Sequence, residues 1–329
     1  MLETPAFLDR GRPDVPDVVV PGGITPFHLG GRPVRGRLIR LGHLAEAILS
    51  RHDNAEPVSA LGGKALALVA GLASALKFQG SFSFQIKGDG PVGLLLADCT
   101  DTGALRFYAR ENEEAVKALL TKDDTADKTV SDRELTGDGY MALTVDQGTE
   151  MDRHQGIVEI TGETLAEMAI HYFETSEQHA CWVKLAARHT EEGWRAGGLI
   201  LERIAGGGGS ESDVDVLTAL DELGEDAWDT AIVLARTLTD EELLDDALPA
   251  PTLLHRLFHE ENLIVGQARA LAYGCRCSKA RLSDVLSRFS DDDLDHMAEE
   301  GVITMKCEFC NHDFTFDRHT VSSQPEPQG

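Results

Sequence analysis

The sequence predicts an α+β fold, in which a mostly antiparallel sheet with packed helices is followed by a helical linker and a small cysteine-bearing domain. Two patterns predict the sheet and its helices. Several short segments alternate apolar and polar residues, as half-buried strands do, and others repeat apolar residues every three or four positions, as amphipathic helices do. The third observation is a set of two close cysteine pairs near the C-terminus, Cys275-x-Cys277 and Cys307-x-x-Cys310.

At 329 residues the chain is long enough for two domains, one of which can bury a full core. Its composition divides it into five parts. The first part contains four prolines with little apolar periodicity, and we expect a flexible extension there. The predicted parts are the extension at 1–22, an α+β core domain at 23–205, a glycine-rich hinge and acidic linker at 206–250, the cysteine-bearing domain at 251–317 and a flexible polar tail at 318–329.

Three helices are predicted in the core domain. Apolar residues from Leu38 to Leu49 share one helical face, and a second apolar stripe runs from Val58 to Leu76. The Gly62-Gly63 pair weakens the second prediction or marks the beginning of that helix. Thr164 and Glu167 have the spacing of a capping box and start the third helix.

Seven strand-like segments complete the core domain. They lie at 82–86, 92–97, 105–109, 141–145, 156–160, 181–187 and 198–204, with a polar loop expected at 121–134. Gly88-x-Gly90-x-x-Gly93 has the letters of a dinucleotide-binding loop. However, Pro91 and the apolar run after it place a strand where that loop requires a helix N-terminus, so we interpret it as a turn.

The linker is acidic and only conditionally folded. After a Gly206–Ser210 hinge, residues 211–250 hold 13 aspartates and glutamates against one basic residue, Arg236. Apolar residues nevertheless recur at helical intervals from Val216 to Leu244. Such a segment forms helices when its apolar face is covered, whereas its self-repulsion favours unfolding when it is alone.

Helix and hairpin signals surround the cysteines. Pro249 to Pro251 end the linker, and Thr252 is the predicted cap of an apolar helix. Ser278 and Ser290 are expected to begin two short helices. The segments 302–305 and 314–316 flank the second cysteine pair like the strands of a β-hairpin.

The formal charge of −26 excludes nucleic acid as the main partner, because so acidic a chain repels phosphate backbones. No basic region followed by an apolar core marks a signal peptide, and the longest apolar run, Ala65 to Leu76, is too short to span a bilayer. We therefore expect a cytoplasmic protein with no membrane partner. In that reducing compartment, clustered cysteines indicate metal or redox chemistry rather than structural disulfides.

The four cysteines are the predicted metal ligands. With 29 residues between Cys277 and Cys307, the two pairs can present four sulfurs to one ion, and Zn²⁺ prefers such a tetrahedral thiolate cage. The alternative is four ordinary buried cysteines, which have no reason to fall in two tight pairs. His296 and His312 lie near enough in sequence to replace a sulfur, but four sulfurs already complete the shell.

The metal would decide whether this domain folds. A structural zinc contributes about 10–16 kcal/mol of apparent binding free energy, more than a module of this size gains from its own core. Two roles remain open from the residues alone. The zinc is either permanently structural, or its thiolates react with oxidants and act as a redox switch. A Cys275–Cys277 disulfide would close a tight ring and be easily reduced again.

No catalytic constellation is present in the sequence. Cys99 and Cys181 are isolated and are interpreted as core or boundary residues rather than nucleophiles. Four histidines have no partner spacing typical of a metal site or a triad, and we interpret each as a satisfied surface residue: His43, His154, His171 and His179.

The chain resembles the redox-regulated heat-shock chaperones of the 33-kDa chaperonin family over residues 24–317. The C-x-C pair, the spacer near thirty residues and the C-x-x-C pair carry the resemblance. Five other segments resemble the family as well: Val34–Gly36, Gln155–Val158, Tyr172–Gln178, Ala196–Leu199 and Leu254–Glu261. The first 22 residues and the polyglycine run depart from the family's pattern, which leaves the docking of the linker on the core open.

The resemblance implies an ATP-independent holdase with no enzymatic turnover. In such proteins the four cysteines hold zinc in the inactive, reduced form. Oxidation implies the disulfides Cys275–Cys277 and Cys307–Cys310, zinc release, unfolding of the switch domain and linker, binding of unfolding client proteins, and dimerisation. Two rival functions remain: a thiol-disulfide oxidoreductase that uses Cys307 and Cys310, and a zinc-ribbon adaptor.

Overall fold

The computed structural model describes residues 17–121, 130–147, 154–204 and 214–321, with the backbone alone for 214–223. Contacts divide the chain into a large unit, Asp17–Gly274, and a second unit that includes everything from Cys275 onward. The large unit combines one extensive sheet with helices, so the α+β class predicted from the sequence is confirmed. The division falls after Gly274, later than the boundary predicted at residue 251.

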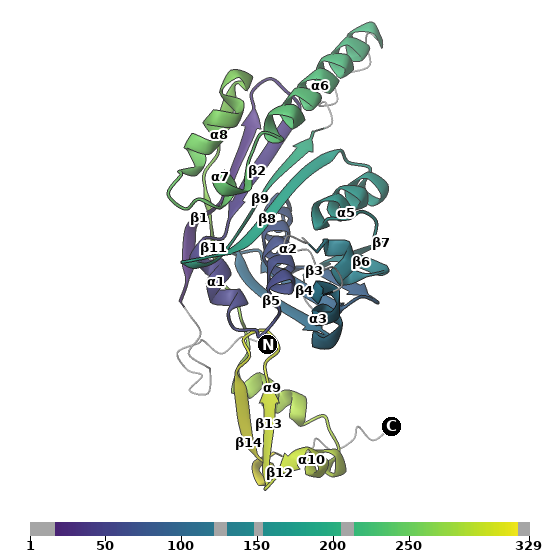
Figure 1. Cartoon of the computed structure of the whole chain (residues 1–329), viewed down its shortest axis with the longest axis vertical. Helices are drawn as coiled ribbons and strands as arrows, with labels where there is room; N and C mark the ends of the chain where they lie inside the picture. The colour runs from purple at the N-terminus through teal and green to yellow at the C-terminus, as the bar shows by residue number, and fades with distance from the viewer. Residues whose placement is uncertain (1–16, 122–129, 148–153, 205–213, 322–329) are drawn as a thin grey trace. The chain divides into compact units, whose positions relative to one another are not determined.

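The sheet of the large unit is antiparallel except at one junction. Its strands lie in the order β7-β6-β3-β4-β5-β11-β1-β2-β9-β8, with β10 beside β1, and only β11 and β5 run parallel (Figure 1). All seven predicted strands are present. The strands are β1 (Val19–Leu29), β2 (Val34–Arg40), β3 (Ser81–Gly88), β4 (Val92–Thr100), β5 (Ala104–Glu111), β6 (Gly139–Asp146), β7 (His154–Glu159), β8 (Cys181–Thr190), β9 (Gly193–Arg203), β10 (Leu263–Val265) and β11 (Arg269–Tyr273).

The N-terminal strands correct two predictions. β1 begins at Val19, inside the stretch predicted as a flexible extension, and residues 1–16 lie outside the described part. Leu38 belongs to β2 rather than to a helix, because the left-handed Gly42 (φ 50°) separates β2 from α1, His43–Leu49. β2 is buried on both faces, so it lacks the alternation by which a half-buried strand is found.

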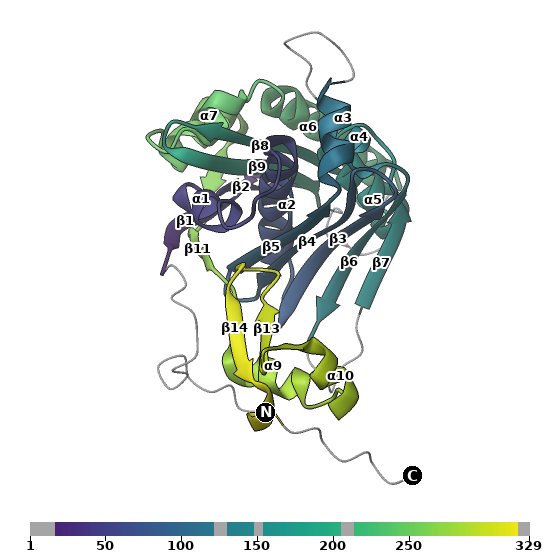
Figure 2. The same ribbon diagram turned by 60° about the horizontal axis from the view of Figure 1, so that its bottom comes forward.

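The central helix α2, Glu56–Ala75, packs against both halves of the sheet (Figure 2). The Gly62-Gly63 pair lies inside the helix rather than at its beginning. A Cβ on Gly62 would lie 2.5 Å from the ring of Phe107, and one on Gly63 would lie 2.8 Å from the Cβ of Ala187. The helix is long and apolar enough to cross a membrane, but 78% of its apolar 18-residue stretch is buried inside the protein.

Capping boxes start two further helices of the large unit. Thr164 and Glu167 cap α5, Leu165–Tyr172, as predicted, and a π-helical turn, η2, continues it over Phe173–Glu177. Ser131 and Glu134 form a second box that starts α4, Asp132–Thr136, inside the segment predicted as a loop. That loop prediction is wrong at both ends, because α3 spans Glu113–Thr121; residues 122–129 lie outside the described part.

The linker folds as helices over a second apolar core. α6 (Val214–Ala235), α7 (Asp240–Leu244) and α8 (Ala250–Phe258) follow the hinge, whose residues lie outside the described part. Buried residues of all three helices pack with β1, β2 and β9, among them Trp228, Leu243 and Leu254. Thr252, the predicted cap, lies inside α8, because Pro249 occupies the N-cap position and Pro251 lies in the first turn, where a missing N–H costs no intrahelical hydrogen bond.

The second unit contains a three-stranded sheet and two short helices. The hairpin of β13 (Val302–Lys306) and β14 (Asp313–Asp317) confirms the prediction, and β12 (Ala298–Glu299) pairs with β13. α9 (Lys279–Leu286) and α10 (Asp291–Met297) begin after Ser278 and Ser290 as expected, and both serine side chains accept a backbone hydrogen bond. Arg318, in the predicted tail, forms ion pairs with Asp291 and Asp295, so an ordered turn precedes residues 322–329, which lie outside the described part.

Candidate metal centre

The first cysteine pair follows directly on the sheet of the large unit. β11 ends at Tyr273, and the N–H of Gly274 donates a hydrogen bond to the carbonyl of Leu105 at 2.7 Å. A Cβ at Gly274 would lie 2.6 Å from the carbonyl carbon of Ala104, so a glycine is required at this close approach. The chain then leaves the sheet and enters the second unit at Cys275.

The second pair lies in the turn of the β13–β14 hairpin. The N–H of Cys307 donates to the carbonyl of His312 at 2.9 Å, and the N–H of Asn311 donates to the carbonyl of Cys307 at 2.8 Å. Asn311 is left-handed (φ 58°), a conformation that asparagine tolerates better than most residues. This turn places Cys307 and Cys310 on one side of the hairpin end, next to the first pair.

The four sulfurs form a compact cluster. The Sγ–Sγ distances are 3.4 Å between Cys275 and Cys277, 3.6 Å between Cys275 and Cys307, and 3.4 Å between Cys277 and Cys310. All four sulfurs lie within 4.8 Å of one another, and no described cysteine is in a disulfide. A zinc–sulfur distance of about 2.3 Å in a tetrahedron gives sulfur–sulfur edges of about 3.8 Å, so the cluster fits a tetrahedral thiolate-bound ion.

Proton sharing within the cluster also favours a cation. The hydrogen bond between Cys275 and Cys277 lowers the pKa of Cys275 to about 7, and hydrogen bonds with Cys275 and Cys277 depress the pKa of Cys307. The same contacts raise the pKa values of Cys277 and Cys310, because each would place a further negative charge beside its neighbours. Four thiolates at these distances need a positive ion between them, which a divalent metal provides.

The neighbouring histidines do not enter the cluster. The ring of His312 packs edge-on against Phe314, with centroids 4.8 Å apart. His296 directs Nδ1 to the carbonyl of Asp292 at 2.6 Å, and its side chain is 78% exposed. In the described part of the chain, the four cysteines form a group whose sulfurs lie close enough together to bind one metal ion, and this convergence was predicted from the sequence.

The other two cysteines are buried in the core of the large unit, as predicted. Burial, reinforced by the negative charge of Glu202, raises the pKa of Cys181 to about 12, which keeps its thiol protonated and unreactive. One histidine prediction is wrong. His179 is half-buried and its Nε2 is enclosed without a hydrogen-bond partner, so it is not a satisfied surface residue.

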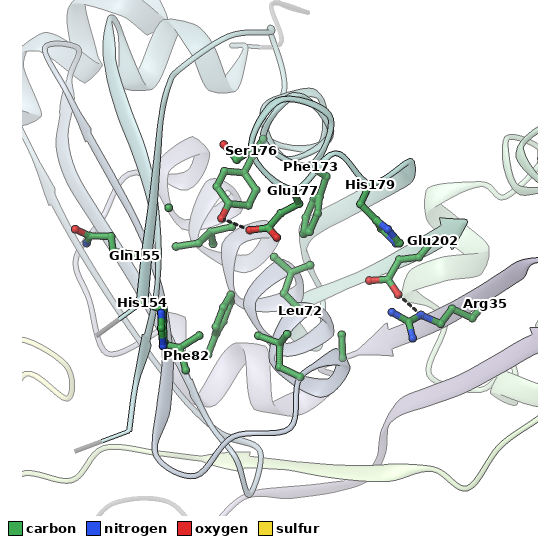
Figure 3. Close-up of a pocket in the computed structure, with 16 residues that line it drawn as sticks. Arg35, Leu72, Phe82, His154, Gln155, Phe173, Ser176, Glu177, His179 and Glu202 are labelled. Atoms are coloured by element: carbon green, nitrogen blue, oxygen red, sulfur yellow. Dashed lines mark hydrogen bonds and ion pairs between the residues drawn. The ribbon is translucent and has the colours of Figure 1, made fainter. Parts of the chain in front are cut away.

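A cavity that the sequence did not predict opens beside His179. It has a volume of about 590 Å³ and lies between the end of α2, the β3-β6-β7 side of the sheet and η2 (Figure 3). At its rim Glu202 accepts hydrogen bonds from Arg35 at 2.6 Å and Arg37 at 2.9 Å. Burial raises the pKa of Glu202, but the two arginines outweigh burial and hold it below its usual value. Part of the cavity wall is the π-helical turn η2, and no sequence pattern reveals such a turn, so the sequence held no signal for the cavity.

Basic residues of the core hold the acidic linker in place. Lys184 and Asp240 form an ion pair at 2.7 Å, and Arg195 and Asp246 form one at 2.6 Å. Arg40 donates hydrogen bonds to two linker carbonyls, those of Glu242 and Leu248. Sequence reasoning considered only the self-repulsion of the linker and missed these partners, although the basic residues of β2, β8 and β9 were visible in the sequence.

The comparison with known families covers most of the chain. The model of the Hsp33 protein family matches residues 23–317, which include both the sheet and the four cysteines. The chain belongs to this family. Membership supports a chaperone function in stress, and the cysteine cluster fits a zinc-binding, redox-active centre.

Individual relatives agree with the family match. The 33 kDa chaperonin of Caulobacter vibrioides is 37% identical over 299 residues, covering 89% of this chain and 94% of its own length. That of Photorhabdus laumondii is 32% identical over 291 residues, covering 88% and 91%. The crystal structure of the 33 kDa chaperonin from Thermotoga maritima shares the fold, with a TM-score of 0.71 and 18% identity over 91% of this chain and 96% of that one.

Proposed function

We propose that this protein is a redox-regulated, ATP-independent holdase that binds unfolding proteins during oxidative stress and has no enzymatic turnover. The observation that carries the proposal is the convergence of four sulfurs in a small unit that comes later in the chain than a helical, strongly acidic linker. Family membership supports the chaperone part of the proposal. The cysteine geometry supports the redox part, because four clustered thiolates combine metal affinity with nucleophilicity toward oxidants.

In the inactive state Cys275, Cys277, Cys307 and Cys310 hold one Zn²⁺ per chain. The ion, when bound, neutralises the thiolates and contributes about 10–16 kcal/mol of binding free energy to the folded state. The unit around it has a modest apolar interior, centred on Leu286, Leu294 and Ile303. The cysteines are therefore the chief support of this unit.

In the activating step the cysteines form the disulfides Cys275–Cys277 and Cys307–Cys310. Each disulfide forms as two thiolates give two electrons to one molecule of peroxide, which takes up two protons and leaves as two molecules of water. Two molecules of peroxide thus consume all four ligands and leave no thiolate to hold the ion. The 3.4 Å contact between Cys275 and Cys277 supports the first pairing, although Cys277 lies equally close to Cys310.

Loss of the metal then favours release of the linker. Residue Cys275 follows β11 directly, and β10, β11 and α8 connect it to the linker along the chain. Undocking α6 and α7 would uncover apolar residues of β2 and β9, including Leu38 and Leu201, whereas Phe27 of β1 stacks on Phe258 of α8. An exposed apolar face of this kind binds the apolar segments of unfolding clients.

The remaining parts of the proposal concern partners and location. The active, oxidised form is proposed to be a homodimer in the cytoplasm, with no nucleic-acid or membrane partner. The formal charge of −26 supports the exclusion of nucleic acid. The burial of α2 supports a soluble protein, since the described helix that could cross a membrane is a core element.

The rival oxidoreductase function is less well supported. Cys307 and Cys310 lie in the turn of a hairpin, whereas a thioredoxin-like motif uses a helix N-terminus to activate its first cysteine. Both cysteines are also buried. A zinc-ribbon adaptor would use the same cluster but would bind its partner in the reduced, zinc-bound form and lose it on oxidation, since the unit depends on its metal for folding.

One experiment separates the three functions. Reduced, zinc-loaded protein is treated with peroxide at mildly raised temperature, zinc release is followed, and aggregation of a heat-denatured client is measured. We expect both zinc release and suppressed aggregation, and zinc release without suppression would refute the holdase. Cys99→Ala is the matched control, because it removes a thiol that lies outside the cluster. Peptide mapping of the oxidised chain by mass spectrometry tests the disulfide pairing.

A further inference from the structure

A pair of exposed histidines lies at the C-terminal end of α8. His255 is in the last turn of the helix and His259 is its C-cap, four residues later, so the two side chains lie on the same side. The opposite side of α8 is buried, through Leu253, Leu254 and Leu257. The two imidazole rings lie with their centroids 5.3 Å apart. Neither the fold nor the proposed switch makes use of this pair.

One hydrogen bond prepares His259 as a ligand. Its Nδ1 lies 3.1 Å from the backbone carbonyl oxygen of His255. A carbonyl can only accept, so Nδ1 carries the proton and donates it. In a neutral imidazole this leaves the lone pair on Nε2. Metal-binding histidines are held in the same way, with the second ring nitrogen donating to a carbonyl or carboxylate.

A carboxylate stands next to the free nitrogen. Oε1 of Glu260 lies 3.8 Å from Nε2 of His259, and the Glu260 side chain is 84% exposed. Glu260 and Glu261 follow His259 in sequence. Glu261 is buried and paired with Arg32 at 2.8 Å, and Arg256 lies between the two histidines, so Glu260 is the exposed carboxylate next to the pair. The formal charge of −26 on the whole chain attracts cations rather than anions.

The spacing of the rings fits a shared ion. Two imidazoles on one metal, with metal–nitrogen distances of about 2.0–2.1 Å and angles of 90–109°, place their ring centroids about 4.5–5.2 Å apart. The observed distance is 5.3 Å, and the rings are stacked with 24° between their planes, so both must rotate before their nitrogens point at one ion. All three side chains are exposed, so rotation about their side-chain bonds brings the ligand atoms together without moving the helix.

We propose that His255, His259 and Glu260 form a second metal site, which binds a divalent transition-metal ion with a preference for imidazole. Ions of this class are Ni²⁺, Cu²⁺ and Zn²⁺, and copper binds such ligands most tightly. Water fills the remaining coordination positions, since the site lies on the surface. The site is independent of the cysteine cluster and of the proposed switch.

The test uses Ni²⁺ as the probe, because Cu²⁺ oxidises thiols. The full, reduced chain is first loaded with one zinc and then titrated with Ni²⁺, with native mass spectrometry to count both metals and calorimetry to measure affinity. We expect a species that carries one zinc and one nickel. His255→Ala and His259→Ala should each lower the nickel affinity by about tenfold or more, the scale on which even supporting residues of a metal site act.

The matched control is His296→Ala, which removes another exposed histidine that contacts a backbone carbonyl on a helix. It should leave nickel binding unchanged. Paramagnetic broadening of the wild-type imidazole resonances by Ni²⁺ locates the site without any substitution. Nickel affinity that is equal in the wild type and the double variant, or nickel uptake that displaces the zinc, would overturn the proposal.

Discussion

Replacing Trp228 by alanine should open the linker without any oxidant. Trp228 lies on α6, is 8% exposed and packs into the apolar core beneath the linker. A tryptophan buries about 150–250 Å², which corresponds to about 4–6 kcal/mol at about 25 cal/mol per Å². Measured Trp→Ala costs are about 3–5 kcal/mol, so we adopt about 3 kcal/mol as the loss of docking free energy. That loss raises the undocked population about a hundredfold.

The assay follows linker opening and chaperone activity in reduced, zinc-loaded protein. Hydrogen exchange read by mass spectrometry should speed up across α6 and α7 in W228A, while exchange in the central strands of the sheet stays slow. The variant should also suppress client aggregation before peroxide is added. Zinc content should be unchanged, since the substitution leaves the four cysteines in place.

A variant on the same helix provides the control. Val233 is 62% exposed, so V233A should change docking by at most about 0.5 kcal/mol and leave both readouts at their wild-type values. Equal exchange in W228A and wild type would refute the docking argument. Fast exchange with no aggregation suppression would instead refute the assignment of the uncovered face as the client-binding surface.

Three further predictions concern charge, pH and packing. Arg195→Ala removes the partner of Asp246 and should make linker exchange faster at low salt. The difference from wild type should shrink at high salt, because salt screens the Arg195–Asp246 pair in the wild type. The pKa of Glu202 is lower in the folded state than in the unfolded state, so its carboxylate stabilises the fold above the unfolded pKa of about 4.3. This stabilisation is lost as the pH falls from there through the folded-state pKa. In urea unfolding, Glu202→Gln should therefore reduce the loss of stability at acid pH. Gly62→Ala places a Cβ 2.5 Å from the ring of Phe107, and such overpacking costs about 1–3 kcal/mol. This cost exceeds the gain of about 0.8–1.0 kcal/mol in helix propensity, so the urea midpoint of unfolding should fall.

Each of these predictions has an outcome that contradicts it. A linker whose exchange is independent of salt in wild type and variant alike would mean that the core cations do not hold it. An unchanged acid limb in the glutamine variant would remove Glu202 as its cause. A raised urea midpoint for the alanine variant would show that the ring next to α2 moves aside easily.

The sequence predicted best where one local signal dominates. Alternation located β3 and β5, a continuous apolar run located β4, and the spacing of Thr164 and Glu167 located the start of α5. The cysteine pairs predicted their own convergence, because metal ligands are recognised by type and spacing. None of these inferences required a residue far away in the sequence.

The failures share a physical cause, which is pairing across long distances. β10 and β11 are short, and their partners β1 and β5 lie far back in the chain, so no local pattern marks them as parts of the main sheet. The basic partners of the linker lie on β2, β8 and β9, and the linker's acidity by itself indicates only repulsion. The unpartnered nitrogen of His179 likewise results from the way that the sheet folds around it.

The placement of β11 gives the linker an unusual topology. The linker begins after β9, which ends at Arg203, and the chain after it passes through α8 to β11. In the sheet, β9 and β11 are separated by β1 and β2. A linker that detaches is therefore a closed loop rather than a free tail. Closing a loop of this length costs about 3–4 kcal/mol of chain entropy, and the folded sheet bears that cost before the linker opens. The sheet thus restrains the detached segment at both ends, so that its return to the core is always an intramolecular step.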